Sequence, residues 1–344
     1  MVKVGIVGLG FMGKMHFDCY QANRKARVVA IADVDPAKRA GDWSAIGGNI
    51  GDASGARVDL SGIKTYARAE DLIADPEVDL VDICLPTYLH ARYTVAALEA
   101  GKHVMCEKPM ALNRRECQKV KQAARKARGK MMVGHCIRFW PEYEVAKRII
   151  DTGRYGQVLS ATFRRVSPTP TWSWKNWLMK APKSGGAALD LHIHDTDYIL
   201  WLFGKPQKVV SLGTRRVTSG VDHIVTHYYY PRRNLQVTAE GGWLMPEGLP
   251  FEMGFTIVCE NGTLEYRSTS GKGLQVFLPG GRILSPKVPP GDGYSRELDY
   301  LLGCIERKRP VETVTPESSA LSVLVVEREV ESVKKRTAVP VRGG

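Results

Sequence analysis

The sequence lacks the features that mark membrane-spanning and disulfide-stabilised proteins. No uninterrupted run reaches the roughly 18 apolar residues that a transmembrane helix needs. The seven cysteines are odd in number, scattered, and never spaced as CxxC. The first residues are apolar but carry no basic leader or small-residue cleavage site, so we expect a strand there and not a signal peptide. We therefore expect a cytoplasmic protein with reduced thiols and no membrane association.

Long blocks of one charge are also missing, although the chain is basic overall. Its 49 Lys and Arg against 36 Asp and Glu give a net charge of +13. The basic residues form short, separated clusters, mostly at the ends of predicted helices and strands, where they complement helix dipoles or keep the surface hydrated. We therefore expect no nucleic-acid partner. The 344 residues, 44% of them hydrophobic, suffice for sizeable cores and favour two domains.

The beginning of the chain has a pattern typical of dinucleotide binding. An apolar, β-branched run from Val2 to Val7 leads directly into the turn Gly8 to Gly13 and then into a helix-like segment. In such a turn the first glycine permits a tight bend, the second lets the backbone approach a pyrophosphate, and the third lets helix and strand pack closely. The helix N-terminus offers amides to the anion. The turn residues predicted to bind the dinucleotide are Gly8, Gly10, Phe11, Met12 and Gly13.

Asp33 ends the second apolar strand, at the position where a carboxylate accepts hydrogen bonds from the adenosine ribose hydroxyls. A 2′-phosphate would meet like charge there, so the sequence favours NAD over NADP. Lys38 and Arg39 lie close enough in sequence to weaken this preference, unless they face water on the next helix.

Strand-like and helix-like segments alternate through residues 1–135, which predicts an α/β Rossmann domain with a doubly wound parallel sheet. Ligands bind beyond the carboxyl ends of such strands. The residues that follow two of these strands, and that we expect to contact the cofactor, are Pro86, Thr87, His90, Glu107 and Lys108. The glycine-rich stretch 42–62 has no assignable role.

Residues 136–315 instead contain strand-like runs joined by turns, which predicts a substrate-binding α+β domain with a large, mostly antiparallel sheet. Its opening helices would cover one face. Leaving the other face free would expose aromatic residues, so we expect it to form the interface of a homo-oligomer, a dimer or tetramer. The aromatic residues concerned include Tyr228, Tyr229, Tyr230 and Trp243. A final helix within 316–344 is expected to pack back on the first domain.

The stretch Gly185 to Asp197 concentrates glycines, carboxylates and imidazoles. If a helix follows the glycine pair, Asp190 and His194 stand at i and i+4 and share one face, where a carboxylate can orient an imidazole as a general base. Asp197 is one turn further on, and His192 is either structural or a substrate contact. A metal site is disfavoured because a helix spreads consecutive candidates around its axis and no further Cys or His pattern closes a site. We expect no metal.

Two further segments are candidates for substrate contact. Arg138 follows the last strand of the first domain, and an indole-rich loop that includes Trp174 and Asn176 precedes the glycine pair. Aromatic faces with a nearby amide suit a ring of hydroxyls, although the indoles could equally pack between domains.

In combination, GLGFMGKMH, Asp33, LPTYLHA, CEKPMAL and GGAALDLHIHDTDYILWLFG resemble the Gfo/Idh/MocA family of nicotinamide-dependent sugar and polyol oxidoreductases, over nearly the whole chain. The resemblance implies that Lys108, Asp190 and His194 are the catalytic set and contact the substrate. His194 would remove the proton of a secondary hydroxyl, Asp190 would orient His194, and Lys108 would hydrogen-bond the hydroxyl or relay its proton.

The resemblance therefore implies an NAD-dependent oxidoreductase acting on a secondary hydroxyl of a monosaccharide, glycoside or cyclitol. One alternative is an enzyme that recycles its NAD internally and cleaves or eliminates a glycosidic substituent. Another is a sensor that binds dinucleotide without catalysis, which the intact Lys108, Asp190 and His194 set disfavours. The motifs identify neither the sugar, nor the carbon, nor the direction of the reaction.

Overall fold

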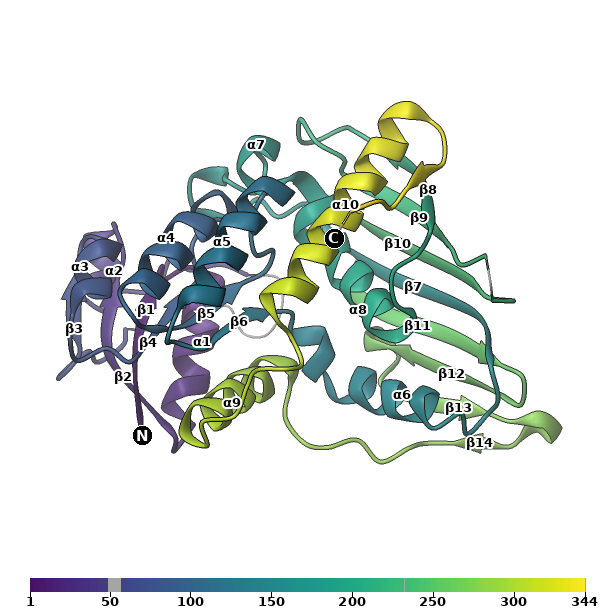
Figure 1. Cartoon of the computed structure of the whole chain (residues 1–344), viewed down its shortest axis with the longest axis horizontal. Coiled ribbons are helices and arrows are strands. Elements are labelled where there is room, and N and C mark those ends of the chain that lie inside the picture. The colour runs from purple at the N-terminus through teal and green to yellow at the C-terminus, as the bar shows by residue number, and fades with distance from the viewer. Residues whose placement is uncertain (49–56, 232, 344) are drawn as a thin grey trace. The chain divides into compact units, whose positions relative to one another are not determined.

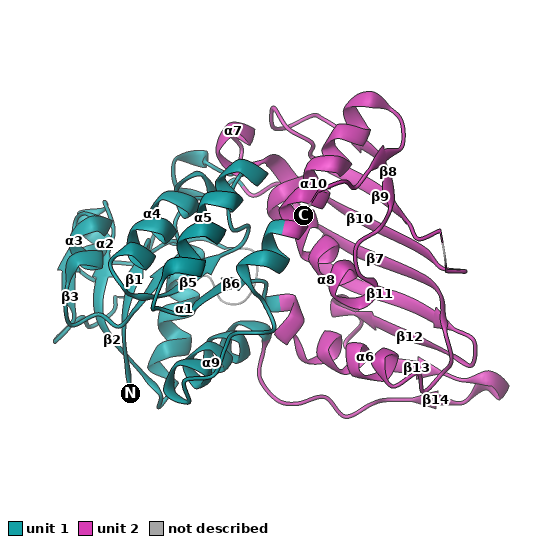
Figure 2. Ribbon diagram, in the orientation of Figure 1, with its two compact units in different colours: residues 1–136, 171–178, 293–320 teal, residues 137–170, 179–292, 321–344 magenta. Residues whose placement is uncertain are grey.

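The computed structural model describes residues 1–48, 57–231 and 233–343, which form two compact units (Figure 2). Unit 1 comprises Met1–Cys136, Thr171–Leu178 and Gly293–Ala320, and unit 2 comprises Ile137–Pro170, Met179–Asp292 and Leu321–Gly344. Residues 171–178 and 293–315, assigned from the sequence to the second domain, and residues 316–320, assigned to the final helix, lie in the same unit as the Rossmann elements. The indole-rich loop is therefore part of unit 1.

The last helix, α10 (Pro316–Lys335), departs from our expectation from Leu321 onward. We expected it to pack on the first domain, but buried polar contacts hold this part within unit 2. The Ser322 hydroxyl donates to Asp197 over 2.8 Å, and the Ser332 hydroxyl accepts from the Ser211 amide over 2.9 Å. Among the described residues no helix, α10 included, is long and apolar enough to cross a membrane.

Unit 1 is built on a six-stranded parallel sheet in the order β3-β2-β1-β4-β5-β6, which confirms the doubly wound prediction (Figure 1). Its central strands are buried on both faces, as parallel strands covered by helices must be. Helices α3, α4 and α5 pack side by side, as do α1 and α9. The strands are β1 (Val2–Val7), β2 (Ala26–Ala32), β3 (Lys64–Tyr66), β4 (Leu80–Ile83), β5 (His103–Glu107) and β6 (Met131–Gly134). The helices are α1 (Phe11–Gln21), α2 (Pro36–Arg39), α3 (Ala69–Ala74), α4 (Thr87–Glu99), α5 (Arg114–Lys126), η2 (Trp174–Asn176) and α9 (Gly293–Glu306).

Unit 2 is built on a nine-stranded sheet in the order β14-β13-β12-β11-β7-β10-β9-β8-β15, in which only β7 and β10 pair in parallel among the described residues. This confirms the large, mostly antiparallel sheet. The strands are β7 (Val158–Pro168), β8 (Lys208–Thr214), β9 (His223–Tyr229), β10 (Gln236–Met245), β11 (Glu252–Cys259), β12 (Gly262–Arg267), β13 (Gln275–Phe277), β14 (Ile283–Leu284) and β15 (Val339–Pro340). The other elements are α6 (Pro141–Asp151), α7 (Ala181–Ser184), η3 (Ala188–His192), α8 (Ile193–Phe203), η4 (Ser268–Ser270) and η5 (Pro279–Gly281), with η1 (Cys136–Phe139) at the unit boundary.

The covered face of this sheet is packed with aromatic rings. The Tyr143 ring of α6 lies 4.9 Å from the rings of both Tyr198 on α8 and Phe255 on β11, in edge-to-face arrangements. The Tyr198 hydroxyl donates to the carbonyl oxygen of Tyr143 over 2.7 Å, so the two helices are joined by a buried hydrogen bond as well. Such pairs stabilise a core beyond their buried area, by about 0.5–1.5 kcal/mol each. They fix α8, and with it the turn that precedes it.

Strand alternation corrects the surface that we expected on the open face of the sheet. Tyr229 is 46% exposed, but its neighbours Tyr228 and Tyr230 are only 3% and 7% exposed, and Trp243 only 2%. Successive strand residues point to opposite faces, so the three tyrosines cannot share one. The exposed apolar side chains of β8 and β9 are Val210, Leu212, Val225 and Tyr229. The homo-oligomer itself remains a prediction.

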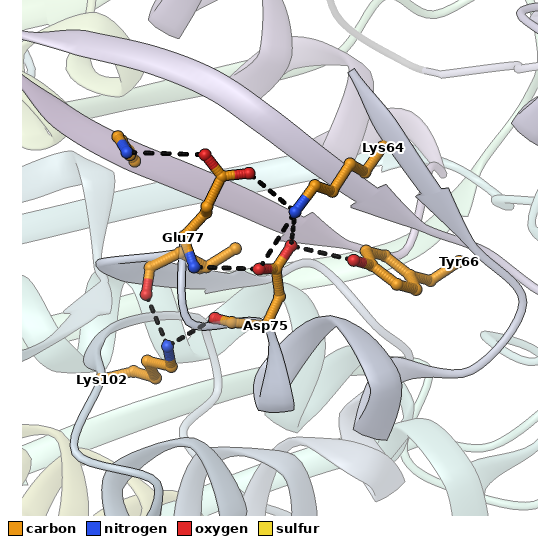
Figure 3. A network of polar contacts seen from close by, with 7 residues as sticks. Lys64, Tyr66, Asp75, Glu77 and Lys102 are labelled. Atoms are coloured by element: carbon orange, nitrogen blue, oxygen red, sulfur yellow. Dashed lines mark hydrogen bonds and ion pairs between the residues drawn. The ribbon is translucent and has the colours of Figure 1, made fainter. Parts of the chain in front are cut away.

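A polar network ties edge strand β3 to the loop between α3 and β4 (Figure 3). The Asp75 carboxylate accepts from Lys64 over 3.0 Å and from the Tyr66 hydroxyl over 2.9 Å. The Lys102 ammonium donates to the carbonyl oxygens of Asp75 and Val78, each over 2.7 Å. This loop enters β4 at its amino end, whereas ligands of doubly wound sheets bind at the carboxyl ends. We therefore assign the network to stability.

Candidate active site

The three glycines of the first turn have distinct environments. Gly8 has a φ of +91°, and a Cβ there would lie 2.8 Å from the Cys84 carbonyl oxygen. A Cβ at Gly13 would lie 1.9 Å from the Gly8 carbonyl oxygen, so only glycine lets α1 approach the turn. A Cβ at Gly10 would meet nothing within 4 Å. No side chain caps the N-terminus of α1. The turn thus combines a tight bend, close helix packing and an open approach to backbone amides, as a pyrophosphate requires.

Phe11, at the start of α1, is covered by two segments from elsewhere in unit 1. The Trp172 ring lies 5.6 Å from the Phe11 ring in an edge-to-face arrangement. A Cβ at Gly48 would lie 2.1 Å from the Phe11 ring, and one at Gly47 would lie 3.0 Å from the Trp172 Cβ. Part of the glycine-rich stretch therefore packs against the glycine turn, while residues 49–56 of that stretch lie outside the described residues. Met12 is half-buried beside Phe11.

Asp33 follows β2 and links three segments around the turn. Its carboxylate accepts from the Leu9 amide over 2.7 Å and from the Asp35 amide over 2.8 Å. The Lys38 ammonium lies 4.0 Å from the same carboxylate, and Arg39 donates to the Asp33 carbonyl oxygen over 2.7 Å. Lys38 and Arg39 therefore do not simply face water on α2, and their positive charges stand close to the carboxylate.

The residues predicted to contact the cofactor in the loop after β4 differ in solvent exposure. Pro86 is half-buried and precedes α4, whereas Thr87 and His90 are both 1% exposed. The His90 Nδ1 lies 2.7 Å from the Pro109 carbonyl oxygen and its Nε2 lies 2.6 Å from the Leu85 carbonyl oxygen. Burial lowers the pKa of His90. His90 thus links the loops after β4 and β5, and its contact with the cofactor remains a prediction.

The two residues at the end of β5 differ in the same way. Lys108 is half-buried, whereas Glu107 is 5% exposed and points into unit 1. The Glu107 Oε1 lies 3.2 Å from the His16 Nε2, and its Oε2 accepts from the Lys108 amide over 3.1 Å. The expected cofactor contact of Glu107 is therefore replaced by an internal one. Lys108 keeps its place at the carboxyl end of a central strand.

In unit 2, the glycine pair opens a π-helical turn and not the α-helix that we expected. Gly185 and Gly186 have φ angles of +80° and +71°, in the left-handed region that favours glycine. The π turn η3 carries Asp190 and passes into α8, whose first turn carries His194. Single π turns within helices occur frequently at functional sites.

Exposure separates the charged residues of this turn into two groups. Within Gly185–Asp197, all of which the structure describes, Asp190 and His194 are half-buried, while His192, Asp195 and Asp197 have no solvent exposure. Asp195 accepts from Nε and a terminal nitrogen of Arg165 over 2.9 and 3.0 Å. Buried charges of this kind must be paired. The turn thus has a buried, ion-paired side and a side that solvent or ligand can reach.

Arg138 serves the buried side of this turn. It is 5% exposed and binds Asp197 through two parallel hydrogen bonds, both of 2.7 Å. Its guanidinium also lies 5.6 Å from the centre of the Trp201 ring. The Arg138 guanidinium therefore anchors α8, and its contact with substrate remains a prediction.

His192 is a structural residue. Its Nε2 lies 3.3 Å from the Glu329 carboxylate of α10 and 3.4 Å from the Tyr228 hydroxyl of β9. Thr196 adds hydrogen bonds to both partners, over 3.2 Å to Glu329 and 3.1 Å to Tyr228. A Cβ at Gly241 would lie 2.8 Å from the His192 Nδ1, so β10 passes directly against the ring. Of the two roles that we left open, the structural one agrees with these contacts.

The indole-rich loop exposes the two residues predicted to contact substrate. Trp174 is 40% exposed and carries the Lys175 ammonium 4.6 Å from its ring centre. Asn176 is exposed and has a φ of +52°, in the left-handed region that asparagine adopts more readily than most non-glycine residues. Both lie on η2 in unit 1. Their contact with substrate remains a prediction.

Several buried residues of these sites were missed from the sequence. They are His16, Asp82, Arg165 and Glu329. A weak signal existed for Asp82, which interrupts the apolar strand Leu80–Ile83. The others sit in ordinary helix or strand patterns, and their partners lie 30 or more residues away, as in the pairs of Arg165 with Asp195 and His192 with Glu329.

Comparison with known proteins agrees with these features. Residues 2–135 match an oxidoreductase family with an NAD-binding Rossmann fold, and residues 143–265 match the GFO/IDH/MocA C-terminal domain. An inositol 2-dehydrogenase of Salmonella paratyphi B is 31% identical over 266 residues, which cover 75% of this chain and 70% of that protein. An uncharacterised oxidoreductase of Streptococcus pneumoniae is 30% identical over 226 residues, which cover 65% of this chain. The chain spans 56% of that relative's length.

Solved structures share the fold of the whole chain at low identity. Levoglucosan dehydrogenase in complex with NADH and levoglucosan superposes with a TM-score of 0.84 at 23% identity, covering 99% of this chain and 100% of that one. The apo scyllo-inositol dehydrogenase from Lactobacillus casei gives a TM-score of 0.79, also at 23% identity, covering 99% and 98%. With a glycine turn suited to a pyrophosphate, a strand-ending lysine and both domain matches, this chain belongs to the GFO/IDH/MocA family of oxidoreductases.

Proposed function

We propose that this protein is an NAD-dependent oxidoreductase that transfers hydride at a secondary hydroxyl of a monosaccharide, glycoside or cyclitol. The observation that supports the proposal is which charged residues are exposed within Gly185–Asp197, the segment that contains the π-helical turn and the start of α8. Its other charged residues are buried in ion pairs, and Asp190 and His194 remain half-buried at its accessible side. Relatives named inositol 2-dehydrogenase support a polyhydroxylated ring as substrate.

The residues of unit 1 fit a dinucleotide. The space beside Gly10 and the uncapped N-terminus of α1 suit the pyrophosphate, and Asp33 stands where the ribose hydroxyls would bind. We propose NAD as the preferred form, because a 2′-phosphate would be repelled by the Asp33 carboxylate. The Lys38 ammonium, 4.0 Å from that carboxylate, reduces the repulsion, so the preference is expected to be modest.

Three residues have separate roles in the proposed chemistry. The nicotinamide, when bound, supplies the hydride acceptor or donor. His194 takes the hydroxyl proton as the alcohol is oxidised, and Asp190 orients the imidazole and stabilises its charged form. Lys108 donates a hydrogen bond to the reacting oxygen. In the reverse direction the same groups return the proton.

A panel of cyclitols and sugars, tested with NAD and with NADP, examines this proposal through NADH absorbance. Accumulation of NADH identifies a dehydrogenase, whereas release of an aglycone without NADH would indicate internal recycling and contradict the proposal.

Variants assign the residues on the best substrate. Lys108→Met and His194→Asn are expected to lower kcat by roughly 10² to 10⁴, while the Kd for NADH changes little. Lys119→Met, at an exposed lysine of α5, is the matched control. Unchanged turnover in Lys108→Met or His194→Asn would remove that residue from the mechanism.

A further inference from the structure

A buried cluster of charged side chains lies within unit 1, directly beneath the end of β5. His16, on the second turn of α1, has no solvent exposure and stands between two carboxylates. Its Nδ1 lies 2.8 Å from the Asp82 Oδ2, and its Nε2 lies 3.2 Å from the Glu107 Oε1. A Cβ at Gly134 would lie 2.9 Å from that Glu107 oxygen, so glycine on β6 provides the room for the carboxylate. His16 thus bridges the ends of two neighbouring strands.

Several of the segments around His16 contribute a titratable group. The Cys84 Sγ lies 3.5 Å from the His16 Nδ1, and the Tyr20 ring stands edge-to-face to the imidazole at 6.5 Å. Glu297 of α9 places a carboxylate oxygen within 4.8 Å of ligand atoms of His16 and Glu107. Burial, together with the Asp82 charge, raises the pKa of the Cys84 thiol and of the Tyr20 hydroxyl, so both stay neutral. The charge balance therefore rests on carboxylates and one imidazole.

A protonated imidazole fits the contacts of His16 better than a bound cation does. Carboxylates this deeply buried require an opposite charge. The His16 Nδ1 hydrogen-bonds the Asp82 carboxylate and its Nε2 lies within ion-pair distance of Glu107, which suits an imidazolium, whereas a metal ligand would need a deprotonated nitrogen. The buried, neutral Cys84 thiol is also a poor ligand.

We propose that His16 is a positioning residue for Lys108. Its imidazolium binds Asp82 and Glu107 and holds the Glu107 carboxylate beneath the Lys108 backbone. The inference rests on the role given to Lys108 in the proposed function. Glu107 accepts from the Lys108 amide over 3.1 Å and is its neighbour in sequence, so its charge also acts on the Lys108 ammonium. Without the imidazolium, Glu107 would pair with that ammonium and withdraw it from the substrate.

The titration behaviour of the cluster agrees with this arrangement. Burial by itself would lower the pKa of His16, but the Asp82 carboxylate reverses the effect and raises it well above its usual value. Burial would likewise raise the pKa of Glu107, but His16 more than offsets it and lowers the pKa. A raised folded-state pKa contributes stability that is complete below about pH 6.5 and is lost only when the pH rises through the raised value.

The protonation state of His16 can be measured directly in the whole chain. Nitrogen-15 labelling of the eight histidines, with the His16 signals assigned by their loss in His16→Gln, should show an imidazolium at pH 8. A neutral His16 ring at pH 8, or a metal ion present in stoichiometric amount with a metal-bound shift, would overturn the proposal.

The positioning effect is tested by the rate at which an amine-specific reagent labels Lys108, measured by peptide mass spectrometry. His16→Gln should slow labelling of Lys108 roughly tenfold, because a new ion pair with Glu107 favours the ammonium over the reactive amine. Exposed Lys119 should label at an unchanged rate. Unchanged labelling of Lys108 in folded His16→Gln would overturn the proposal.

A double variant separates this effect from general damage to the fold. His16→Gln combined with Glu107→Gln removes both charges and should restore Lys108 labelling to the wild-type rate, whereas continued slow labelling would contradict the mechanism. If His16→Gln alone does not fold, the double variant still allows Lys108 labelling to be measured. None of these readouts depends on turnover, so a protein inactive on every sugar would refute the proposed function without affecting them.

Discussion

Replacing Arg138 by methionine tests whether this residue anchors the catalytic turn or contacts the substrate. The change keeps most of the side-chain volume but removes two hydrogen bonds of 2.7 Å to Asp197, a carboxylate with no solvent exposure. Breaking a buried ion pair from one side costs about 3–5 kcal/mol. Because 1 kcal/mol shifts the Tm of a unit of this size by about 2–4 °C, we expect a loss of roughly 6–20 °C. Only 5% of Arg138 is exposed, so little of this energy is lost to solvent screening.

Thermal and urea unfolding measure the effect, and two further variants control it. Arg148→Met, at an exposed arginine of α6, should change stability by no more than about 0.5 kcal/mol. Arg138→Met combined with Asp197→Leu removes both buried charges and should recover much of the loss. An Arg138→Met protein with an unchanged Tm but a raised KM for substrate would refute the anchoring role and restore the substrate contact predicted from the sequence.

Two other predictions concern the dinucleotide turn. Gly10→Ala should leave the Tm nearly unchanged but raise the Kd for NADH, because the added methyl group enters open space that the pyrophosphate would use. Gly13→Ala should instead destabilise unit 1, because its methyl group would lie 1.9 Å from a backbone oxygen. Equal effects of the two on stability would contradict this assignment. Asp33→Asn should raise the ratio of kcat/KM for NADP to kcat/KM for NAD roughly tenfold, and Lys38→Ala should lower the same ratio roughly tenfold. Each variant removes one unit charge near the 2′ position of the ribose.

The parts of the fold predicted correctly are those with local signals. The strand Val2–Val7 and a final helix within 316–344 follow from apolar periodicity and from the glycine and proline at their ends, and the structure has the strand with the same bounds and the helix over Pro316–Lys335. The glycine turn could be predicted because Gly8 and Gly13 each meet a steric requirement set within a few residues or by one neighbouring strand. Such demands are written in short stretches of sequence.

The errors have one physical cause, which is that exposure and pairing are decided by distant parts of the chain. The sequence predicted Tyr228 and Tyr230 to be exposed aromatic residues, whereas strand pairing in the structure turns both toward the buried face. Arginine and histidine often bind ligands, but Arg138 and His90 are both buried by partners that no local sequence pattern reveals. Helix α10 lies more than 100 residues from the turn that its Glu329 contacts.

The π-helical turn and the start of α8 show how burial sorts similar residue types within the proposed active site. Its buried charges are held from three separate elements, by Arg165 of β7, by Arg138 and by Glu329 of α10. Three attachments on one side fix both the position and the rotation of a short helical segment, so the side chains on its accessible side have a defined direction before any ligand binds. The energy of forming buried ion pairs is small or unfavourable compared with apolar packing, and stability alone does not explain them here. Their value lies in orientation, because a carboxylate and an imidazole used in proton transfer must be held within a fraction of an ångström.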